Sequence, residues 1–174
     1  IKLKVKDQVF KTKGKIIANP LYETKPGQYE AYDKLMSEME ANLTEMHKKV
    51  NTLKSIQDQI VNLTSDMENE GLKKKGEEIV TTLKAWDEAM VQRKTKAYDD
   101  VENFENKFTA DYMFLINQTE SSIPRVNQSS LDRKQELDSI WVKYEQQADE
   151  WLNTTIPAYN KALWDAGVGA IQVR

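Results

Sequence analysis

The chain has 174 residues, of which 30% are charged and 39% hydrophobic, and its formal net charge is only -3. This length supports one hydrophobic core, and the absence of cysteine excludes disulfides, thiolate zinc sites and a cysteine nucleophile. The interspersed charges disfavour nucleic acid as a partner, and no stretch approaches the ~18 consecutive apolar residues of a membrane-spanning helix.

Apart from Asp7, the first nine residues alternate between apolar and polar side chains, which predicts a half-buried β-strand. Gly14 separates this strand from a second short one at residues 15–18, and a two-stranded hairpin alone is only marginally stable. Residues 18–27 contain Asn-Pro and Pro-Gly pairs, which predict an irregular connector. The first residues are no signal peptide. We therefore expect residues 1–27 to be the arm of an upstream β-domain, with any targeting signal further upstream.

A long helix is predicted for residues 29–67, because apolar residues recur at alternating steps of three and four. This stripe comprises Tyr29, Tyr32, Met36, Met39, Leu43, Met46, Val50 and Leu53. At roughly 1.5 Å per residue the helix is almost 60 Å long, which is typical of one rod in a bundle. After Leu53 the stripe shifts to Ile56, Ile60, Leu63 and Met67, so the two halves should contact different partners. Gly71 predicts an end near Glu68.

A second helix is predicted to begin within residues 72–76. Its first stripe comprises Ile79, Leu83, Trp86 and Met90, and after the polar residues 93–100 an apolar face resumes through Val101, Phe104, Phe108, Tyr112 and Leu115. Since no Pro or Gly occurs between residues 77 and 123, the periodicity allows either one helix or two pieces. We favour a break near residues 94–104.

A third helix is predicted after Pro124, which biases the preceding residue away from the helical region. Ser129 or Ser130 caps this helix, whose stripe comprises Leu137, Trp141, Tyr144, Ala148, Trp151, Ile156, Tyr159 and Leu163. Pro157 predicts either a kink or a restart capped by Thr155. Gly167 then ends the helix, and an apolar extended tail follows.

Two segments resemble metal or catalytic sites. Acidic residues in the segment 66–77 have the spacing of a calcium-binding loop. However, Glu68 and Glu70 have side chains that overshoot the ion, and three lysines crowd the site, so we interpret the segment as a helix-turn-helix corner. His47 is the only histidine. It cannot build a zinc site without several converging carboxylates, and we interpret it as a surface or seam-edge residue.

A cluster of four carboxylates, Asp99, Asp100, Glu102 and Glu105, has the chemistry to bind a cation or to act as an acid and base pair. Helical carboxylates are usually just solvated, and we favour that interpretation. We therefore expect no catalytic residue, no metal and no cofactor.

The four tryptophans are candidates for stacking on sugar rings. Trp86, Trp141 and Trp151 lie on or beside a stripe, where core packing is the simpler interpretation. Trp164 differs, because its neighbour Leu163 already occupies the stripe. We therefore single out Trp164, together with Tyr159, as a candidate interaction surface near the end of the bundle.

Three short segments carry a family resemblance. Ile16-Ile17-Ala18-Asn19-Pro20-Leu21 forms a strand-like run with a turn, residues 101–108 form a connector, and residues 157–167 match the pattern Pro-x-x-Asn-x-x-Leu-x-x-x-Gly. In this order they resemble the helical C-terminal region of bacterial sortilin-like proteins with Asp-box (BNR) β-propellers, which are often labelled glycosyl-hydrolase-like. The resemblance implies an accessory helical region of an exported protein, with any binding or catalytic surface on the propeller.

We therefore expect an all-α fold, an antiparallel bundle of three long helices over residues 28–174 with the middle one interrupted, plus the short β arm of residues 1–27. The expected function is a non-catalytic structural or interaction module of a bacterial cell-envelope or outer-membrane-associated protein, in the periplasm or at the cell surface. Its expected partners are an upstream β-propeller or β-domain and, by the resemblance alone, carbohydrate. The alternatives are a coiled-coil-like oligomerising adaptor and, third, an enzyme accessory domain with an unrecognised site.

Overall fold

The structure is a computed structural model that describes residues 1–173, apart from the side chains of Tyr98 and Val101. Its elements are β1 (Lys2–Val5), β2 (Gln8–Lys11), α1 (Gln28–Ser65), α2 (Glu70–Met90), the short 3-10 helix η1 (Tyr98–Glu102), α3 (Phe108–Glu120), α4 (Gln128–Glu150), the π-helical turn η2 (Trp151–Thr155) and α5 (Ile156–Asp165). The fold is 66% helical, which confirms the expected class. Within the described residues no helix is long and apolar enough to cross a membrane.

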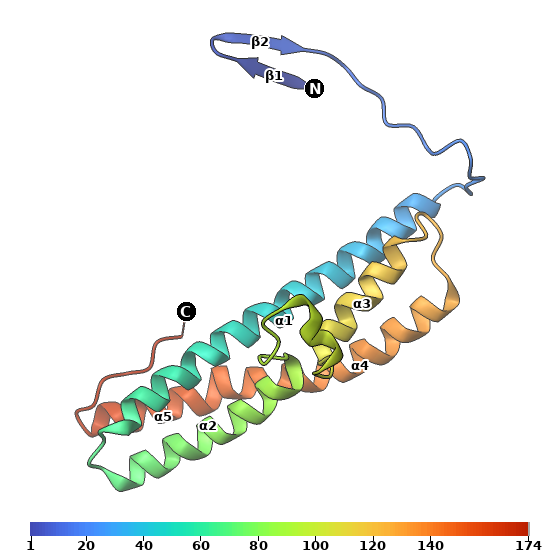
Figure 1. Cartoon of the computed structure of the whole chain (residues 1–174). Helices are drawn as coiled ribbons and strands as arrows, with labels where there is room; N and C mark the ends of the chain where they lie inside the picture. The colour runs from blue at the N-terminus through green and yellow to red at the C-terminus, as the bar shows by residue number, and fades with distance from the viewer. Residues whose placement is uncertain (174) are drawn as a thin grey trace.

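The helices lie alongside one another (Figure 1). α1 runs the length of the helical part, α2 packs along its C-terminal half and α3 along its N-terminal half, while α4, η2 and α5 form one continuous run. The predicted count of three long helices is wrong: α2 and α3 are separate helices, so the described residues form four helices when α4, η2 and α5 are counted as one. The chain leaves the helical path at Val91, whose backbone is extended with ψ 145°. This break contains the predicted interruption at residues 94–104.

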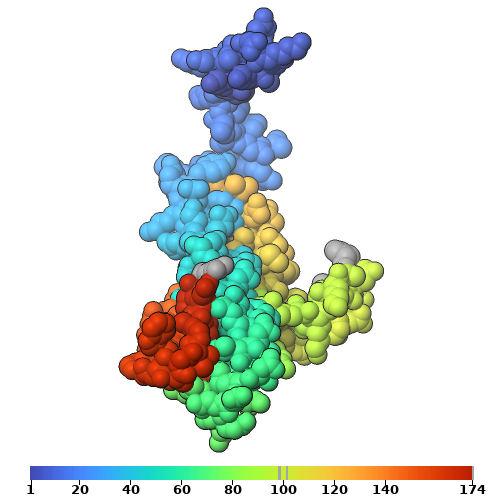
Figure 2. Space-filling model, turned by 90° about the vertical axis from the view of Figure 1, so that its left-hand side faces the viewer, coloured from blue at the N-terminus to red at the C-terminus, as the bar shows by residue number. Residues whose placement is uncertain are grey.

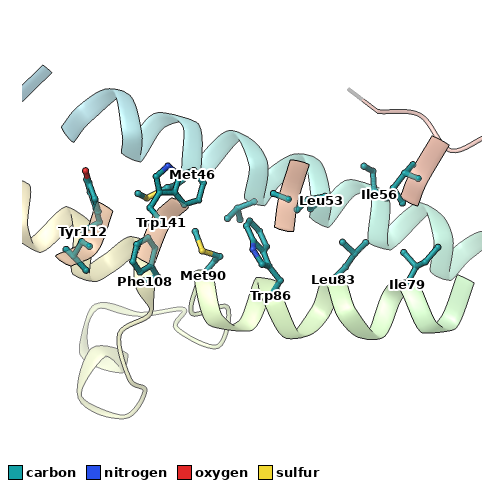
Figure 3. Close-up of a cluster of buried hydrophobic side chains, with 14 of the residues drawn as sticks. Met46, Leu53, Ile56, Ile79, Leu83, Trp86, Met90, Phe108, Tyr112 and Trp141 are labelled. Carbon is teal, nitrogen blue, oxygen red and sulfur yellow. The ribbon is translucent and has the colours of Figure 1, made fainter. Parts of the chain in front are cut away.

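The two halves of α1 contact different helices, as the shift in its stripe predicts. In the N-terminal half, the Asn42 side chain donates a hydrogen bond of 3.0 Å to the hydroxyl of Tyr112 in α3. In the C-terminal half, Ile60 and Thr64 lie against Gly76 of α2. Figure 3 shows this seam, with Met46 of α1 beside Trp141 and Ile56 of α1 facing the side chains of Leu83 and Ile79 in α2.

Large apolar and aromatic side chains fill the core between these helices. Trp86 donates a hydrogen bond from Nε1 to the Tyr144 carbonyl at 3.1 Å, and its ring packs edge-on against Trp151 at 6.1 Å between centroids. Trp141 is buried as well. The interpretation as core residues is therefore confirmed for Trp86 and Trp141, whose rings lie between the helices (Figure 3), while Trp151 is partly buried and packs against this core.

The helix ends differ from the predicted ones. α1 ends at Ser65, and Gly71 lies inside α2, so the predicted glycine stop is wrong. The Asn69 side chain instead caps α2 by accepting a hydrogen bond from the Leu72 backbone N–H at 3.1 Å, which satisfies a free donor of the first turn. Likewise, α4 is capped by Asn127 and not by a serine.

The helix passes Pro157 without restarting. The π-helical turn η2 immediately precedes α5, and Pro157 occupies one of the first positions of α5. A π-helical turn widens the backbone ring. It therefore accommodates the missing N–H and the bulk of the proline ring within one continuous helical run.

The N-terminal arm is a tight hairpin. β1 and β2 pair antiparallel, with Leu3 opposite Phe10 and Val5 opposite Gln8. The predicted strand through residue 9 and the second strand at residues 15–18 are therefore wrong. The chain reverses at Lys6-Asp7. A two-residue hairpin loop of this kind requires positive φ, and Lys6 accordingly has φ +52°. Residues 1–23 are all exposed, and the hairpin stands apart from the helices (Figure 1).

Candidate functional site

The segment between α2 and α3 is the longest loop that interrupts the helical part. Its residues 91–107 project from the side of the helices (Figure 2). It contains the short helix η1, and loops on a rigid scaffold often carry binding residues. We therefore take this loop and its surroundings as the candidate functional site.

The two ends of the loop are held together. The Thr109 hydroxyl at the start of α3 donates to the Met90 carbonyl at the end of α2, at 2.9 Å. The Gln92 side chain spans the base of the loop, because its Nε2 donates to the Glu105 carbonyl at 3.2 Å and its Oε1 accepts from the Lys94 N–H at 3.1 Å. The loop is therefore a closed projection on a fixed base.

An ion pair fixes the first residues of the loop to α2. Asp87 is only 6% exposed, and its two carboxylate oxygens accept hydrogen bonds of 2.5 Å from Nε and Nη2 of Arg93. The hydrogen bond to Asp87 is the main reason that the pKa of Arg93 lies above its usual value. This two-point contact orients a planar guanidinium group at the rim of the neighbouring pocket.

The pocket beside this ion pair has a volume of about 340 Å³. Its wall comprises Lys54 and Gln57 from α1, Lys84, Asp87 and Glu88 from α2, and Val91, Gln92, Arg93, Lys94 and Lys107 from the loop. We call it the loop pocket. Its lining holds five cationic side chains and two carboxylates, so the loop pocket has the electrostatic character of an anion site.

Apart from Arg93, the cations of the loop pocket have exposed or distant partners, and Lys54 pairs with Asp58, whose side chain is 56% exposed. Lys84 lies 3.9 Å from Glu88, and Lys107 lies 3.7 Å from Glu105. The ammonium group of Lys94 lies 6.0 Å from the centre of the Phe104 ring. Exposed ion pairs of this kind contribute little free energy, so these side chains can exchange their partners for a ligand.

The acidic cluster does not converge. Asp100 accepts hydrogen bonds from the backbone N–H groups of Lys96 and Ala97 at 2.7 and 2.9 Å, and these bonds lower the pKa of its carboxyl group. Asp99, Glu102 and Glu105 are exposed. In the described part of the chain, no three acidic, cysteine or histidine residues are grouped to hold a metal ion. Asp100 therefore shapes the loop.

The other residues singled out from the sequence lie apart. His47 is exposed on α1. The segment 66–77 is mostly helix, since α2 begins at Glu70, and it does not have the shape of a calcium loop. Trp164 is 76% exposed, whereas Tyr159 is fully buried and donates a hydrogen bond to the Leu72 carbonyl at 3.0 Å. The two aromatic residues do not form one exposed surface.

Sequence reasoning missed the loop pocket. Arg93 and Lys94 were visible as part of the polar stretch that weakens the second stripe. Their meeting with Lys54 and Lys84 depends on how α1 and α2 pack, and helical periodicity does not specify the neighbours of exposed residues.

Comparisons with protein-family models, curated proteins and solved structures found no significant match to this chain. The resemblance to sortilin-like proteins therefore stays a prediction, and the function must be argued from the molecule itself.

Proposed function

We propose that this chain is a non-catalytic structural and interaction module. In this proposal the helices form an antiparallel bundle that serves as a scaffold, and the N-terminal hairpin is its docking element. The partner is a β-sheet of a neighbouring domain, in the same polypeptide or the same complex. The single observation that carries the proposal is the hairpin, which combines an exposed apolar face with two unpaired strand edges.

The apolar face of the hairpin supports docking. Side chains alternate along a strand, so Ile1, Leu3 and Val5 share one face, and Phe10 joins them opposite Leu3. Their exposed fractions are 83, 59, 49 and 54%. A two-stranded hairpin alone is marginal in water, and burial of these four side chains against a partner would supply the missing stabilisation.

The edges and the charge of the arm indicate how the partner is contacted. Both strands of a two-stranded sheet are edges with free backbone groups, which fits addition to the edge of another sheet. Residues 1–17 contain six lysines and one aspartate. We infer a partner strand flanked by acidic side chains, because complementary charges select orientation and partner.

Contacts within the helical part support the role of a scaffold. The stripe of α1 is buried in its own chain, which favours a scaffold over an adaptor that oligomerises through that stripe. The Tyr112 hydroxyl donates to Asp138 at 2.7 Å and accepts from Asn42, so one polar network ties α3, α4 and α1. Such a network fixes a single arrangement of packed helices. The location in a bacterial envelope, implied by the family resemblance, stays a prediction.

Hydrogen exchange tests the docking proposal. The chain alone is compared with the same chain in its native assembly, purified under non-denaturing conditions. We expect the backbone amides of β1 and β2 to exchange at least about tenfold more slowly in the assembly. Leu3→Asp with Phe10→Asp should abolish this protection, whereas the control Ile16→Asp should not, since Ile16 is fully exposed and lies outside the strands. Unprotected hairpin amides in the assembly would refute the proposal.

A carbohydrate partner is a second candidate, and the exposed indole of Trp164 favours it. Exposed aromatic faces combine apolar area with a polar edge and suit sugar rings. A glycan array tests this candidate. Binding that is lost in Trp164→Ala but kept in Phe114→Ala, another exposed aromatic side chain, would support sugar recognition, and an array without any bound glycan would remove it.

A further inference from the structure

We propose that the loop pocket is a binding site for a small ligand that carries phosphate groups. The proposal concerns a different face of the molecule from the hairpin and is independent of the docking proposal. It rests on the pocket's charge, its volume and the fixed position of Arg93.

The charge of the loop pocket contrasts with that of the chain around it. Residues 1–17 contribute a net charge of +5, so residues 18–174 carry a net charge of -8. Within this acidic part, the pocket lining has three more cations than carboxylates. A cavity lined by one sign of charge concentrates counter-ions. The lysines and the arginine come from α1, α2 and both ends of the loop, so folding gathers them from separate segments.

The size and the lining of the pocket fit an organic phosphate. A volume of about 340 Å³ lies at the lower end of the range for small-molecule sites. Lysine ammonium groups bind phosphate as point charges, and arginine adds directed hydrogen bonds. Val91 supplies an apolar contact, and the amides of Gln57 and Gln92 supply polar contacts for the rest of the ligand.

Arg93 is already positioned before a ligand arrives. Asp87 accepts from its Nε and Nη2 atoms, and among the described residues its Nη1 group has no hydrogen-bond partner. The Arg93 side chain therefore loses most of its conformational entropy when the protein folds, and it loses less when a ligand binds. Lys84 and Lys107 can turn from their distant carboxylates to a phosphate, because charge-assisted hydrogen bonds to phosphate are stronger than exposed ion pairs.

Isothermal titration tests this proposal with three probes, namely inorganic pyrophosphate, glucose 6-phosphate and unphosphorylated glucose. We expect saturable binding of at least one phosphate probe with a dissociation constant below about 1 mM at low salt, weakening as salt increases, and no binding of glucose. Tighter binding of glucose 6-phosphate would assign the site to phosphate esters, and tighter binding of pyrophosphate to free phosphates. No saturation by either phosphate probe would overturn the proposal.

Two double variants separate the loop pocket from general attraction of anions. Lys84→Gln with Lys107→Gln removes two pocket cations and should raise the dissociation constant at least about tenfold. Lys74→Gln with Lys75→Gln changes the net charge equally, but these exposed lysines lie in the first half of α2, outside the lining. We expect this control to change the constant less than about twofold. Equal weakening by both pairs would overturn the site, provided that circular dichroism shows both variants folded.

Discussion

Replacement of Gly76 by alanine tests the packing of α2 against its neighbours. A Cβ atom built on Gly76 would lie 2.5 Å from the Tyr159 hydroxyl oxygen, 2.7 Å from Thr64 Cγ2 and 3.1 Å from Ile60 Cγ2. Contacts below 3.0 Å are essentially never observed for Cβ atoms, so α2 or its neighbours must move. Gly76 therefore allows α2 to approach both α1 and α5 closely.

The expected effect of Gly76→Ala combines three contributions. Alanine is favoured over glycine inside a helix by about 1 kcal/mol. Overpacking a closed core costs roughly 1–3 kcal/mol, and displacement of Tyr159 from the Leu72 carbonyl removes a hydrogen bond of about 1 kcal/mol. The free energy of unfolding should therefore fall by about 1–3 kcal/mol, and a loss of 2 kcal/mol lowers Tm by roughly 4–8 °C in a chain of this size.

Urea unfolding followed by circular dichroism measures this loss. Gly71→Ala is the matched control in the same helix, because its Cβ would meet only Asn69 Oδ1 at an ordinary 3.5 Å, and it should cost no stability. In a Tyr159→Phe background the hydroxyl is absent, so Gly76→Ala should be less destabilising there, by more than about 0.5 kcal/mol. A Gly76→Ala protein as stable as the wild type would refute the close approach.

Three further predictions concern pH and the arm. Burial raises the pKa of Tyr32, Tyr112 and Tyr159 above the ordinary value of 10.0, so their contribution to stability is complete below pH 10 and declines above it. Urea unfolding should therefore show a free energy of unfolding that falls from pH 9 to pH 11, and this fall should be smaller in Tyr112→Phe. An equal fall in the variant would contradict the assignment. The pKa of the Asp100 carboxyl group lies below its ordinary value of 3.8, so the carboxylate should stay ionised and keep its two backbone hydrogen bonds as pH falls to about 4, and lose them only below its folded pKa. An amide NMR titration in which the two N–H donors respond at or above pH 4 would contradict this. Deletion of residues 1–17 should change the unfolding free energy of the helices by less than about 0.5 kcal/mol, because these residues are exposed, and a larger loss would reveal a packed arm.

The apolar stripes predicted most of the helical core. Tyr32, Met36, Met39, Met46, Val50, Leu53, Ile56 and Ile60 are all buried, as their spacing on one helix face requires. A stripe indicates which face is removed from water and needs no knowledge of the partner. The shift of the stripe after Leu53 also predicted that the two halves of α1 contact different helices, because a stripe that rotates on the helix surface must meet a second surface.

The turns were less predictable, because their local signals conflict. Gly71 is a common residue after a helix end, yet Asn69 two positions earlier is a strong helix start, and the structure uses the asparagine. The hairpin turn at Lys6-Asp7 lacks the glycine or asparagine that marks most two-residue turns. The sequence sign of the chain reversal is weak: Asp7 places a single polar residue where the alternation would put an apolar one.

The loop pocket lies beyond sequence reasoning for a different reason. Its cations are exposed or half-buried residues on α1, α2 and the loop, and such positions carry no periodic signal that relates one element to another. The helical glycine at position 76 is similar, because its purpose is visible only when Tyr159 and Thr64 lie against it. The loop pocket and the close packing at Gly76 both depend on how separate elements pack against one another, and the residue pattern within one element does not specify that packing.

The long break between α2 and α3 is not needed to connect them. The Thr109 hydroxyl reaches the Met90 carbonyl at 2.9 Å, so the two helix ends already touch, and helices that meet in this way can be joined by a few residues. The chain instead inserts residues 91–107, which gives up helical hydrogen bonds and orders additional backbone at an entropic cost. What this insertion adds is Arg93, Lys94 and Lys107 around a pocket whose remaining cations come from α1 and α2. The loop is therefore better explained by the pocket it completes than by the connection it makes.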